Sequence, residues 1–527
     1  MILDHLDAVC PRELKADICI VGAGAAGLAL ATEFANSDLQ VVLLESGGWE
    51  PDPRTQALYH TEQTGMPFQS AHTGRFRIFG GSTTQWGGQS LPLTPLDFEP
   101  REWVNHSGWP IAYDELLPFY QRANQFLGVD TRDYYDETAA ILSLERPLLD
   151  PASIEYHFSK WAPQPDLRQT YRKVLERATN IHVILHANVV ELVVNGPRVT
   201  TVHIRSFSGH SDSIEAENFI LATGGLEVPR LLLASRRHMP TGLGNEHDQV
   251  GRFLQEHPAT RLGEVEVIDA DKLQQLFNGR RAEGRRFSAR LSLSRAMQEK
   301  ESLLNASAGF LFSLPLDRGF GLVRAAVKGR TAKLPDATPC RILNEAIRCL
   351  PELIKASWRL GVDGWIYTPG ASCEVAASFE QEPNPFSRVT LSEKQDELGM
   401  PLGHIHWALT RKTYVTAVKF ASVIDQTLRT LQVGRLKTSN WLVHDDGVSD
   451  YEHFFHDQNH HIGTARMSVS PQNGVVDPAL KVHSLQNLFI ASCATFPTGG
   501  HSNPTLTMLA LAIRLADHLK NKYQKKY

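Results

Sequence analysis

The feature that most constrains this chain is a glycine-rich turn near its N-terminus, set between two short apolar runs. Residues 18–21 read ICIV, the turn Gly22-Ala23-Gly24-Ala25-Ala26-Gly27 follows at once, and a second run, VVLL, occupies 41–44. Short continuous apolar runs are typical of strands buried on both faces of a parallel sheet. The Ala- and Leu-rich stretch between them predicts a helix, so residues 16–48 predict a strand–helix–strand unit.

The glycine spacing of this turn has a physical reason. Gly22 allows the tight turn, Gly24 lets the backbone approach a pyrophosphate, and Gly27 lets the helix lie close to the strand. The free N–H groups at the helix start favour phosphate, and Glu45 can accept hydrogen bonds from ribose hydroxyls. We predict a dinucleotide site here; the alternative is a glycine-rich turn without a ligand. The residues predicted to form the site are Gly22, Gly24, Ala25, Ala26, Gly27, Glu45 and Ser46.

Composition narrows the class of protein further. A chain of 527 residues exceeds one simple domain. Its net charge of -5 includes no basic block, so a nucleic-acid partner is not expected. No apolar run approaches about 18 residues, which makes a membrane span unexpected. The N-terminal residues lack a basic, apolar leader pattern, so we expect a cytoplasmic location. The six cysteines form no C-x-x-C pair, so neither a disulfide framework nor a zinc site is indicated.

A second glycine-rich stretch lies at 74–90 and reads GRFRIFGGSTTQWGGQS. Two glycine pairs flank small hydroxylated residues and a tryptophan, and a backbone of this kind can lie against a flat ring. The alternative is an ordinary surface loop. The residues that we expect to contact a cofactor here are Gly80, Gly81, Ser82, Trp86, Gly87 and Gly88.

Further segments follow in a fixed order. They include DFEPREWVNHSGWPIAYDELLPFYQRA at 97–123, ENFILATGGLEVPRLLLAS at 217–235, NEHDQVGRFLQEHP at 245–258, NHHIGTARM at 459–467 and NLFIASCATFPTGGHSNPTLTMLALAIRLADHL at 487–519. Together with both glycine-rich stretches, the chain resembles the glucose–methanol–choline (GMC) oxidoreductases. Only about 130–165 and 260–440 carry little of the resemblance.

The resemblance implies an α/β fold, in which an FAD-binding Rossmann-like domain of the p-hydroxybenzoate-hydroxylase-like architecture is interleaved with an α+β substrate-binding domain. The FAD-binding domain would comprise residues 13–90, 166–258 and 450–520. The substrate-binding or cap domain would comprise residues 91–165 and 259–449. The resemblance adds expected FAD contacts at Val190, Thr223, Gly224, Pro504 and Thr505.

Two positions depart from the family pattern. Some sugar-oxidising relatives hold the flavin covalently through a histidine in the second glycine-rich stretch, and this chain has Gln85 there. Since glutamine cannot form that bond, we expect FAD bound without a covalent link. Ser492 stands where the family usually has an aspartate, which puts one FAD contact in doubt.

Oxidation of an alcohol by hydride transfer needs a base for the hydroxyl proton, and a histidine with its pKa of ~6.5 suits that role near pH 7. A hydrogen-bond donor beside it would hold the developing alkoxide. The resemblance places the base at the first histidine of H-x-x-G-T, which is His460, and its partner at Asn503. His501 is a neighbour of uncertain role. The alternatives are a surface histidine and a turn asparagine.

Four histidines, His453, His456, His460 and His461, lie close together in the sequence and raise a metal site as a further alternative. No carboxylate or cysteine set completes it, so we expect no metal.

The function that these features predict is FAD-dependent oxidation of an alcohol, with a secondary hydroxyl of a sugar or glycoside as the favoured substrate and oxygen or a quinone-type molecule as the electron acceptor. An Asn partner resembles the pyranose-oxidising members of the family. The variable half offers polar candidates for ring hydroxyls, namely Gln381, Asn384, Arg388, His404 and His406. The alternatives are a non-sugar alcohol, a flavin-bearing lyase on the same scaffold, and a flavin-binding protein without activity. The oligomeric state is left open.

Residues 341–360 predict a helical stripe, because apolar residues recur there every three or four positions, and Pro351 predicts a kink or two short helices. The stretch 328–360 is basic. We expect this segment to lie against its own domain; the alternative is a helix that docks on a membrane surface or a partner.

Overall fold

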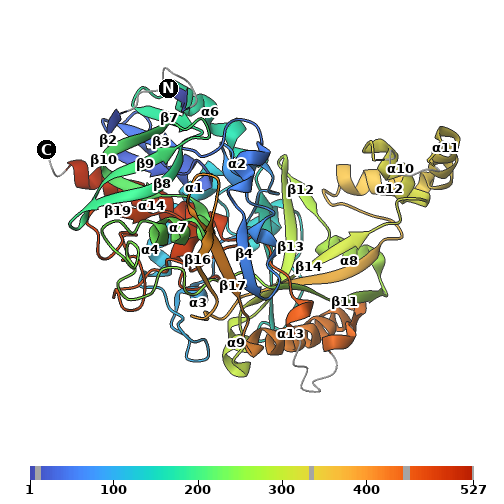
Figure 1. The fold of residues 1–527 in the computed structure, drawn as a ribbon. Coiled ribbons are helices and arrows are strands. Elements are labelled where there is room, and N and C mark those ends of the chain that lie inside the picture. The colour runs from blue at the N-terminus through green and yellow to red at the C-terminus, as the bar shows by residue number, and fades with distance from the viewer. Residues whose placement is uncertain (6–12, 331–336, 443–450, 525–527) are drawn as a thin grey trace.

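The computed structural model describes residues 1–5, 13–330, 337–442 and 451–524. The described strands form two eight-stranded sheets and a smaller three-stranded sheet. Figure 1 shows the large sheets side by side, with β2, β3 and β10 in one and β11, β13 and β14 in the other.

The first sheet is mainly parallel, with an antiparallel edge. Its order is β1-β7-β3-β2-β10-β9-β8, and β19 runs parallel beside β10. The two apolar runs form the adjoining strands β2 and β3, with Ile18 opposite Val41, and helix α1 begins at Ala25, within the glycine-rich stretch. The bounds are β1 (Ile2–Asp4), β2 (Glu13–Val21), α1 (Ala25–Phe34), β3 (Val41–Leu44), β7 (Ile181–Leu185), β8 (Asn188–Asn195), β9 (Arg198–Arg205), β10 (Ser211–Leu221) and β19 (Leu488–Ile490).

Helix α14 (Thr505–Gln524) lies between α1 and helix α4 (Tyr113–Phe126). Tyr120 of α4 and Thr507 of α14 share a hydrogen bond of 2.9 Å between their hydroxyls. Leu116, Tyr120 and Ala123 of α4 are buried in the same cluster as the side chains of α1 and the first sheet. Residues 113–126 therefore lie in the dinucleotide-side core, although they belong to the segment 91–165 that we grouped with the substrate side. The domain boundaries stay a prediction.

The second sheet is antiparallel, with order β18-β11-β15-β14-β13-β6-β5 and β12 beside β13. Side chains alternate between its faces. One face buries residues such as Tyr156, Phe158 and Phe287 in a second core with helices α8 and α13. The bounds are β5 (Gln89–Ser90), β6 (Ile154–Trp161), β11 (Ala259–Val267), α8 (Ala270–Phe277), β12 (Arg280–Ala282), β13 (Arg285–Leu293), β14 (Ala306–Ser313), β15 (Ser372–Phe379), α13 (Arg411–Thr430) and β18 (Gly434–Thr438).

The small sheet joins distant parts of the sequence. Strand β4 (Thr61–Gly65) pairs in parallel with β17 (Pro401–Trp407), which pairs antiparallel with β16 (Arg388–Gln395). The fold is the expected one, a Rossmann-like α/β domain interleaved with a domain built on an antiparallel sheet.

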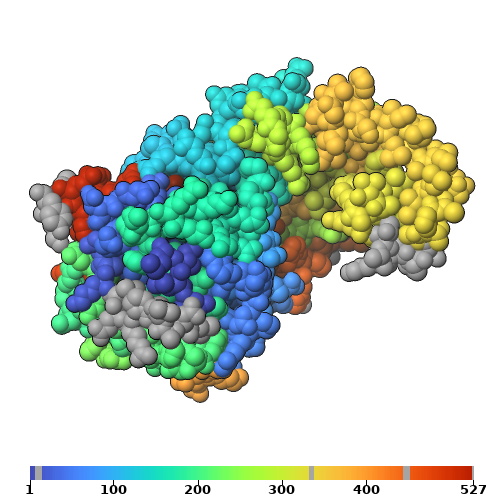
Figure 2. Space-filling model, turned by 90° about the horizontal axis from the view of Figure 1, so that it is seen from above, coloured from blue at the N-terminus to red at the C-terminus, as the bar shows by residue number. Residues whose placement is uncertain are grey.

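Helices α10 (Gly319–Val327), α11 (Pro339–Arg348) and α12 (Leu350–Gly361) form a lobe that stands away from the body, as both Figure 1 and Figure 2 show. The break at Pro351 gives two short helices, as predicted. The expectation that this segment lies against its own domain is met only in part: an ion pair joins α12 to α8, but neither α11 nor α12 contains a buried residue. Amphipathic spacing identified the helices, but it does not fix which surface their apolar face meets.

The other helices of the described chain are short and connect or cover these layers. No described helix combines the length and apolar character needed to cross a bilayer. Their bounds are α2 (Pro53–Ala57), α3 (Pro95–Phe98), α5 (Asp136–Ile141), α6 (Leu167–Arg177), α7 (Gly224–Ala234) and α9 (Arg295–Glu301).

Candidate active site

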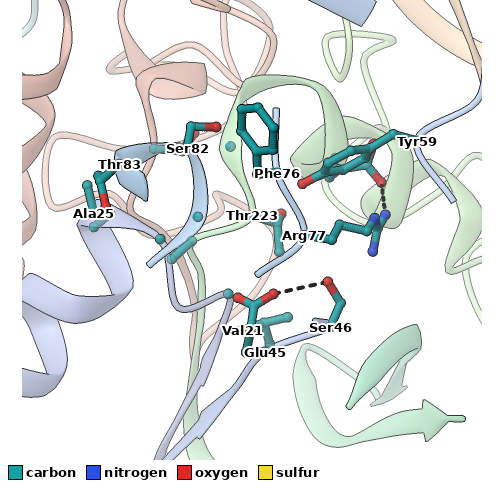
Figure 3. A pocket seen from close by; sticks show the side chains of 18 of the residues that line it. Val21, Ala25, Glu45, Ser46, Tyr59, Phe76, Arg77, Ser82, Thr83 and Thr223 are labelled. Atoms are coloured by element: carbon teal, nitrogen blue, oxygen red, sulfur yellow. Dashed lines mark hydrogen bonds and ion pairs between the residues drawn. The ribbon is translucent and has the colours of Figure 1, made fainter. Parts of the chain in front are cut away.

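A cavity of about 540 Å³ opens at the carboxyl ends of β2 and β3 (Figure 3). Ligands of open parallel sheets bind at this end of the strands. The predicted residues that line it are Gly22, Gly24, Ala25, Ala26, Glu45, Ser46, Gly81, Ser82, Trp86, Gly87, Val190, Thr223, Gly224, His460, Asn503 and Thr505. Gly27, Gly80, Gly88 and Pro504 are not among the lining residues.

The three glycines of the first turn meet different surroundings. Gly22 has φ +102°, and a Cβ there would lie 2.7 Å from the carbonyl oxygen of Ala222. A Cβ at Gly27 would lie 1.9 Å from the carbonyl oxygen of Gly22, so this glycine permits close approach of helix and strand. A Cβ at Gly24 would meet no protein atom within 4 Å, because this position faces the cavity. That space is where a pyrophosphate fits against the start of α1.

The second glycine-rich stretch lies directly on the first turn. The Gly80 N–H donates to the carbonyl of Ala23 at 3.0 Å, and a Cβ at Gly81 would lie 2.9 Å from the Cα of Gly24. Trp86 donates through Nε1 to the carbonyl of Pro165 at 2.7 Å. The two stretches thus form one continuous wall of the cavity, which accounts for the small residues in both.

Glu45 is buried at the end of β3 and binds the turn itself. Its carboxylate accepts from the N–H groups of Ala23 and Gly47, each at 2.9 Å, and from the Ser46 hydroxyl (Figure 3). Burial raises the pKa of Glu45, while these donors oppose the shift. A carboxylate oxygen can accept more than one hydrogen bond, so a ribose contact stays a prediction.

Several lining residues were not predicted. Figure 3 shows Tyr59, Phe76 and Arg77 around the cavity. The Arg77 guanidinium lies 4.3 Å from the centre of the Tyr59 ring and donates to Glu227 at 2.9 Å. Thr223, which was predicted as an FAD contact, lines the cavity as well, and its hydroxyl has no partner among the described residues. No residue spacing in the sequence marks Tyr59 or Arg77, because their contact forms only in the folded chain.

His460 and Asn503 meet at the cavity wall. The Nε2 atom of His460 lies 3.4 Å from Nδ2 of Asn503, and its Nδ1 lies 2.8 Å from Nδ1 of His257. The other ring nitrogen of His257 lies 3.2 Å from the carbonyl oxygen of Gly499. The result is a chain of side chains that begins at Asn503 and ends at a backbone carbonyl.

The chemistry of these groups assigns the tautomers. A carbonyl oxygen only accepts, so Nε2 of His257 carries the hydrogen and, in the neutral ring, Nδ1 is the acceptor. His460 must then donate from its own Nδ1, which leaves a lone pair on Nε2. An amide nitrogen only donates, so Asn503 agrees with this assignment. The basic nitrogen of His460 therefore faces Asn503.

Burial keeps both imidazoles neutral. It lowers the pKa of His460 well below the ordinary value, with His257 and His461 adding to the effect. Burial likewise lowers the pKa of His257 to about 4. Since a base must be unprotonated to accept a proton, His460 is competent at neutral pH and below.

Glu256 holds the backbone beside His460. This buried carboxylate accepts from the N–H groups of His460 at 2.7 Å, Gln458 at 3.1 Å and His257 at 3.1 Å. Burial raises the pKa of Glu256 to about 8, and the backbone donors oppose that shift. Glu256 and His257 lie in the quoted segment 245–258 but were not singled out. Their signal was an acidic residue next to a histidine, directly before Pro258.

The neighbouring histidines lie elsewhere. His461 is buried against Phe68 and Ser70, with Nε2 2.9 Å from the Ser70 hydroxyl, and it does not line the cavity. His501 contacts Ser502 and also lies outside the lining. His453 and His456 are exposed. Across residues 1–5, 13–330, 337–442 and 451–524, no group of three or more potential metal ligands is gathered.

The polar candidates of the variable half are not at the cavity. Gln381 is buried and bonds to Glu256, Trp407 and the backbone. Arg388 pairs with Asp248 at 2.8 Å, and His404 contacts Thr390 and Thr64. Neither these nor Asn384 and His406 line it. The amides that do are Gln85, Gln89, Asn188, Gln458, Asn459 and Asn503.

Comparison with known proteins agrees with this geometry. Residues 17–251 match the family model described as FAD dependent oxidoreductase, and residues 383–512 match the model described as GMC oxidoreductase. Fructose dehydrogenase large subunit from Gluconobacter japonicus is 24% identical, covering 96% of this chain and 98% of the relative. Paromamine 6'-oxidase from Streptomyces fradiae is 24% identical over 95% and 90%. 2-Methyl-1,2-propanediol dehydrogenase from Mycolicibacterium austroafricanum is 23% identical over 97% and 96%.

Solved structures share the fold. Pyridoxine 4-oxidase from Mesorbium loti matches with TM-score 0.58 and 18% identity over 96% of this chain and 99% of that one. A formate oxidase matches with TM-score 0.60 and 16% identity over 98% and 100%. The chain belongs to the GMC oxidoreductases. It is an FAD-dependent enzyme that acts on CH–OH donors.

Proposed function

We propose that this enzyme oxidises a secondary hydroxyl of a sugar or glycoside to a ketone, with His460 as the base and Asn503 as its partner. The supporting observation is a cavity that brings the His460–Asn503 pair together with several side-chain amides. Amides both donate and accept, so they can pair with the hydroxyls of a ring and select which C–H group is presented.

Bound FAD supplies the acceptor for the hydride that leaves the carbinol carbon. The lone pair on Nε2 of His460 accepts the hydroxyl proton. Nδ2 of Asn503, 3.4 Å away, donates to the same oxygen as negative charge develops on it. His257 is a positioning residue, since its acceptor nitrogen keeps the hydrogen of His460 on Nδ1. Glu256 positions the backbone of the same residue.

Two relatives act, by their names, on a sugar and on an aminoglycoside component, and a third acts on a small diol. A non-sugar alcohol is therefore the second candidate. The test is anaerobic reduction of the flavin by glucose, xylose and aryl glycosides against choline, benzyl alcohol and 2-methyl-1,2-propanediol. Bleaching by the second set alone would overturn the sugar assignment. A flavin that stays oxidised while substrate is converted would instead indicate a lyase.

We also propose that FAD is held without a covalent bond, because Gln85 lines the cavity where a nucleophilic side chain would be needed. Acid precipitation should release all flavin into the supernatant. Flavin that stays with the protein pellet would contradict this. The reduced enzyme should pass its electrons to oxygen or to a quinone-type acceptor, and reoxidation by each in stopped flow distinguishes the two.

A further inference from the structure

The lobe of α10–α12 carries an apolar stripe that no described part of the chain buries. Five large side chains, at spacings of three and four, are each between 53% and 63% exposed. A stripe of this kind on a monomer is normally buried, and contiguous exposed apolar surface marks an interaction site. The stripe comprises Leu343, Ile347, Leu350, Ile354 and Trp358.

Ion pairs between α12 and α8 involve the basic side of α12 and not its apolar stripe. Lys355 of α12 pairs with Asp271 of α8 at 2.7 Å, and Arg359 pairs with Asp363 at 2.7 Å and approaches Asp271 at 3.6 Å. The basic flank of α12 thus faces the body. The five side chains of the apolar stripe are not drawn into that contact and stay more than half exposed.

The same lobe is strongly basic. Residues 317–363 contain nine Lys and Arg against five Asp and Glu, although the whole chain has a net charge of -5. Arg324, Lys328 and Arg330 lie near Arg281 and Arg286 of the β12–β13 hairpin. The pKa of Lys328 is lowered, first by Arg324, then by burial, and then by the other three arginines. Within the described residues, none of these five side chains forms an ion pair with a carboxylate.

We propose that the lobe docks on an anionic lipid surface, with the stripe at the boundary of headgroups and acyl chains and the basic cluster against lipid phosphates. Helices of 10 and 12 residues are too short to span a bilayer but suit an interfacial position. The positive charge of the lobe is complementary to an anionic lipid leaflet. A second copy of the chain is a poorer occupant, because a twofold contact through this surface brings like charges together.

The test is flotation of the FAD-loaded enzyme with vesicles of phosphatidylcholine, alone or with about one third phosphatidylglycerol. The wild type should bind the anionic vesicles, less so at high salt. The combined variant Arg324→Gln, Lys328→Gln, Arg330→Gln should bind about 10²-fold more weakly, since each basic residue near an anionic surface contributes about fivefold. The combined variant Leu343→Ser, Ile347→Ser, Ile354→Ser should lose binding at least tenfold.

A control replaces three apolar residues that are more exposed than the stripe and lie outside the lobe, Leu148→Ser, Ile268→Ser and Val469→Ser. This control should bind vesicles as the wild type does, and flavin reduction by substrate should be unchanged in all three variants. Equal binding to both vesicle types, or full binding by the stripe variant, would overturn the proposal. A dimer in light scattering that the stripe variant abolishes, without vesicle binding, would assign the surface to a second copy instead.

Discussion

The His460 site and the α10–α12 lobe treat their side chains in opposite ways. At the site, the buried Glu256 and His257 and the partly buried His460 and Asn503 each have a hydrogen-bond partner, and Nε2 of His460 faces the cavity wall at Asn503. On the lobe, apolar and basic side chains stay in water with few partners. A buried network fixes protonation and direction at a stability cost if any member is lost. An exposed surface keeps its groups available for a partner.

The largest effect is expected when the proposed base, His460, is removed. His460→Ala should slow flavin reduction by roughly 10²- to 10⁴-fold, the usual range for a positioned acid–base group. His461→Ala should slow it by less than about tenfold, because His461 faces Ser70 rather than the cavity. Single-turnover stopped flow measures both, with bound FAD checked by absorbance. A larger loss in the His461 variant would move the base by one residue.

The next effect concerns the tautomer. His257→Leu removes the acceptor for Nδ1–H of His460, so we expect kcat to fall by roughly 10- to 100-fold with KM little changed. His257→Asn places a carbonyl oxygen near the lost nitrogen and should recover most of the rate. Steady-state kinetics and the pH profile of both variants are the measurements. If the Asn variant is as slow as the Leu variant while both are folded, His257 has only a structural role.

A smaller effect is expected from pH. The pKa of His460 is lowered by burial, so the neutral, active form persists as pH falls below 6.5 and is lost only when pH passes the lowered value. The rate of flavin reduction should therefore be flat across neutral pH and decline only in acid well below 6.5. A half-maximal rate near pH 7 would contradict the buried, neutral imidazole.

The smallest effect is expected on the lobe. Leu343→Ser, Ile347→Ser and Ile354→Ser each change an exposed residue, so each should alter the free energy of unfolding by no more than about 0.5 kcal/mol. Chemical denaturation and flavin reduction should match the wild type. A clear destabilisation would show that the stripe contributes to the core of the lobe.

The two regions also differ in what their sequences could predict. The first turn was predictable because its backbone geometry leaves no room for a Cβ at Gly22 or Gly27, and such positions can be recognised from glycine spacing. The family resemblance placed His460 and Asn503 on one cavity. His257 was missed because its contact with His460 joins residues 203 positions apart. The stripe of α11 and α12 was predicted as a helix but assigned to the wrong surroundings, because periodicity records which face is apolar and not what covers it.

The hydrogen-bonded chain behind His460 stops at a backbone carbonyl, and this limits where a proton can go. In the proposed mechanism, once Nε2 of His460 has accepted a proton, the positive charge can shift to His257, but Gly499 offers only an acceptor oxygen and cannot pass the proton on. The two histidines can therefore share the positive charge, but they cannot release a proton at the Gly499 end. The proton has to leave through Nε2, the atom that received it, and so through the cavity that the substrate occupied. In the proposed mechanism, the ring of His460 therefore regains its neutral form only when Nε2 again meets an acceptor within the cavity.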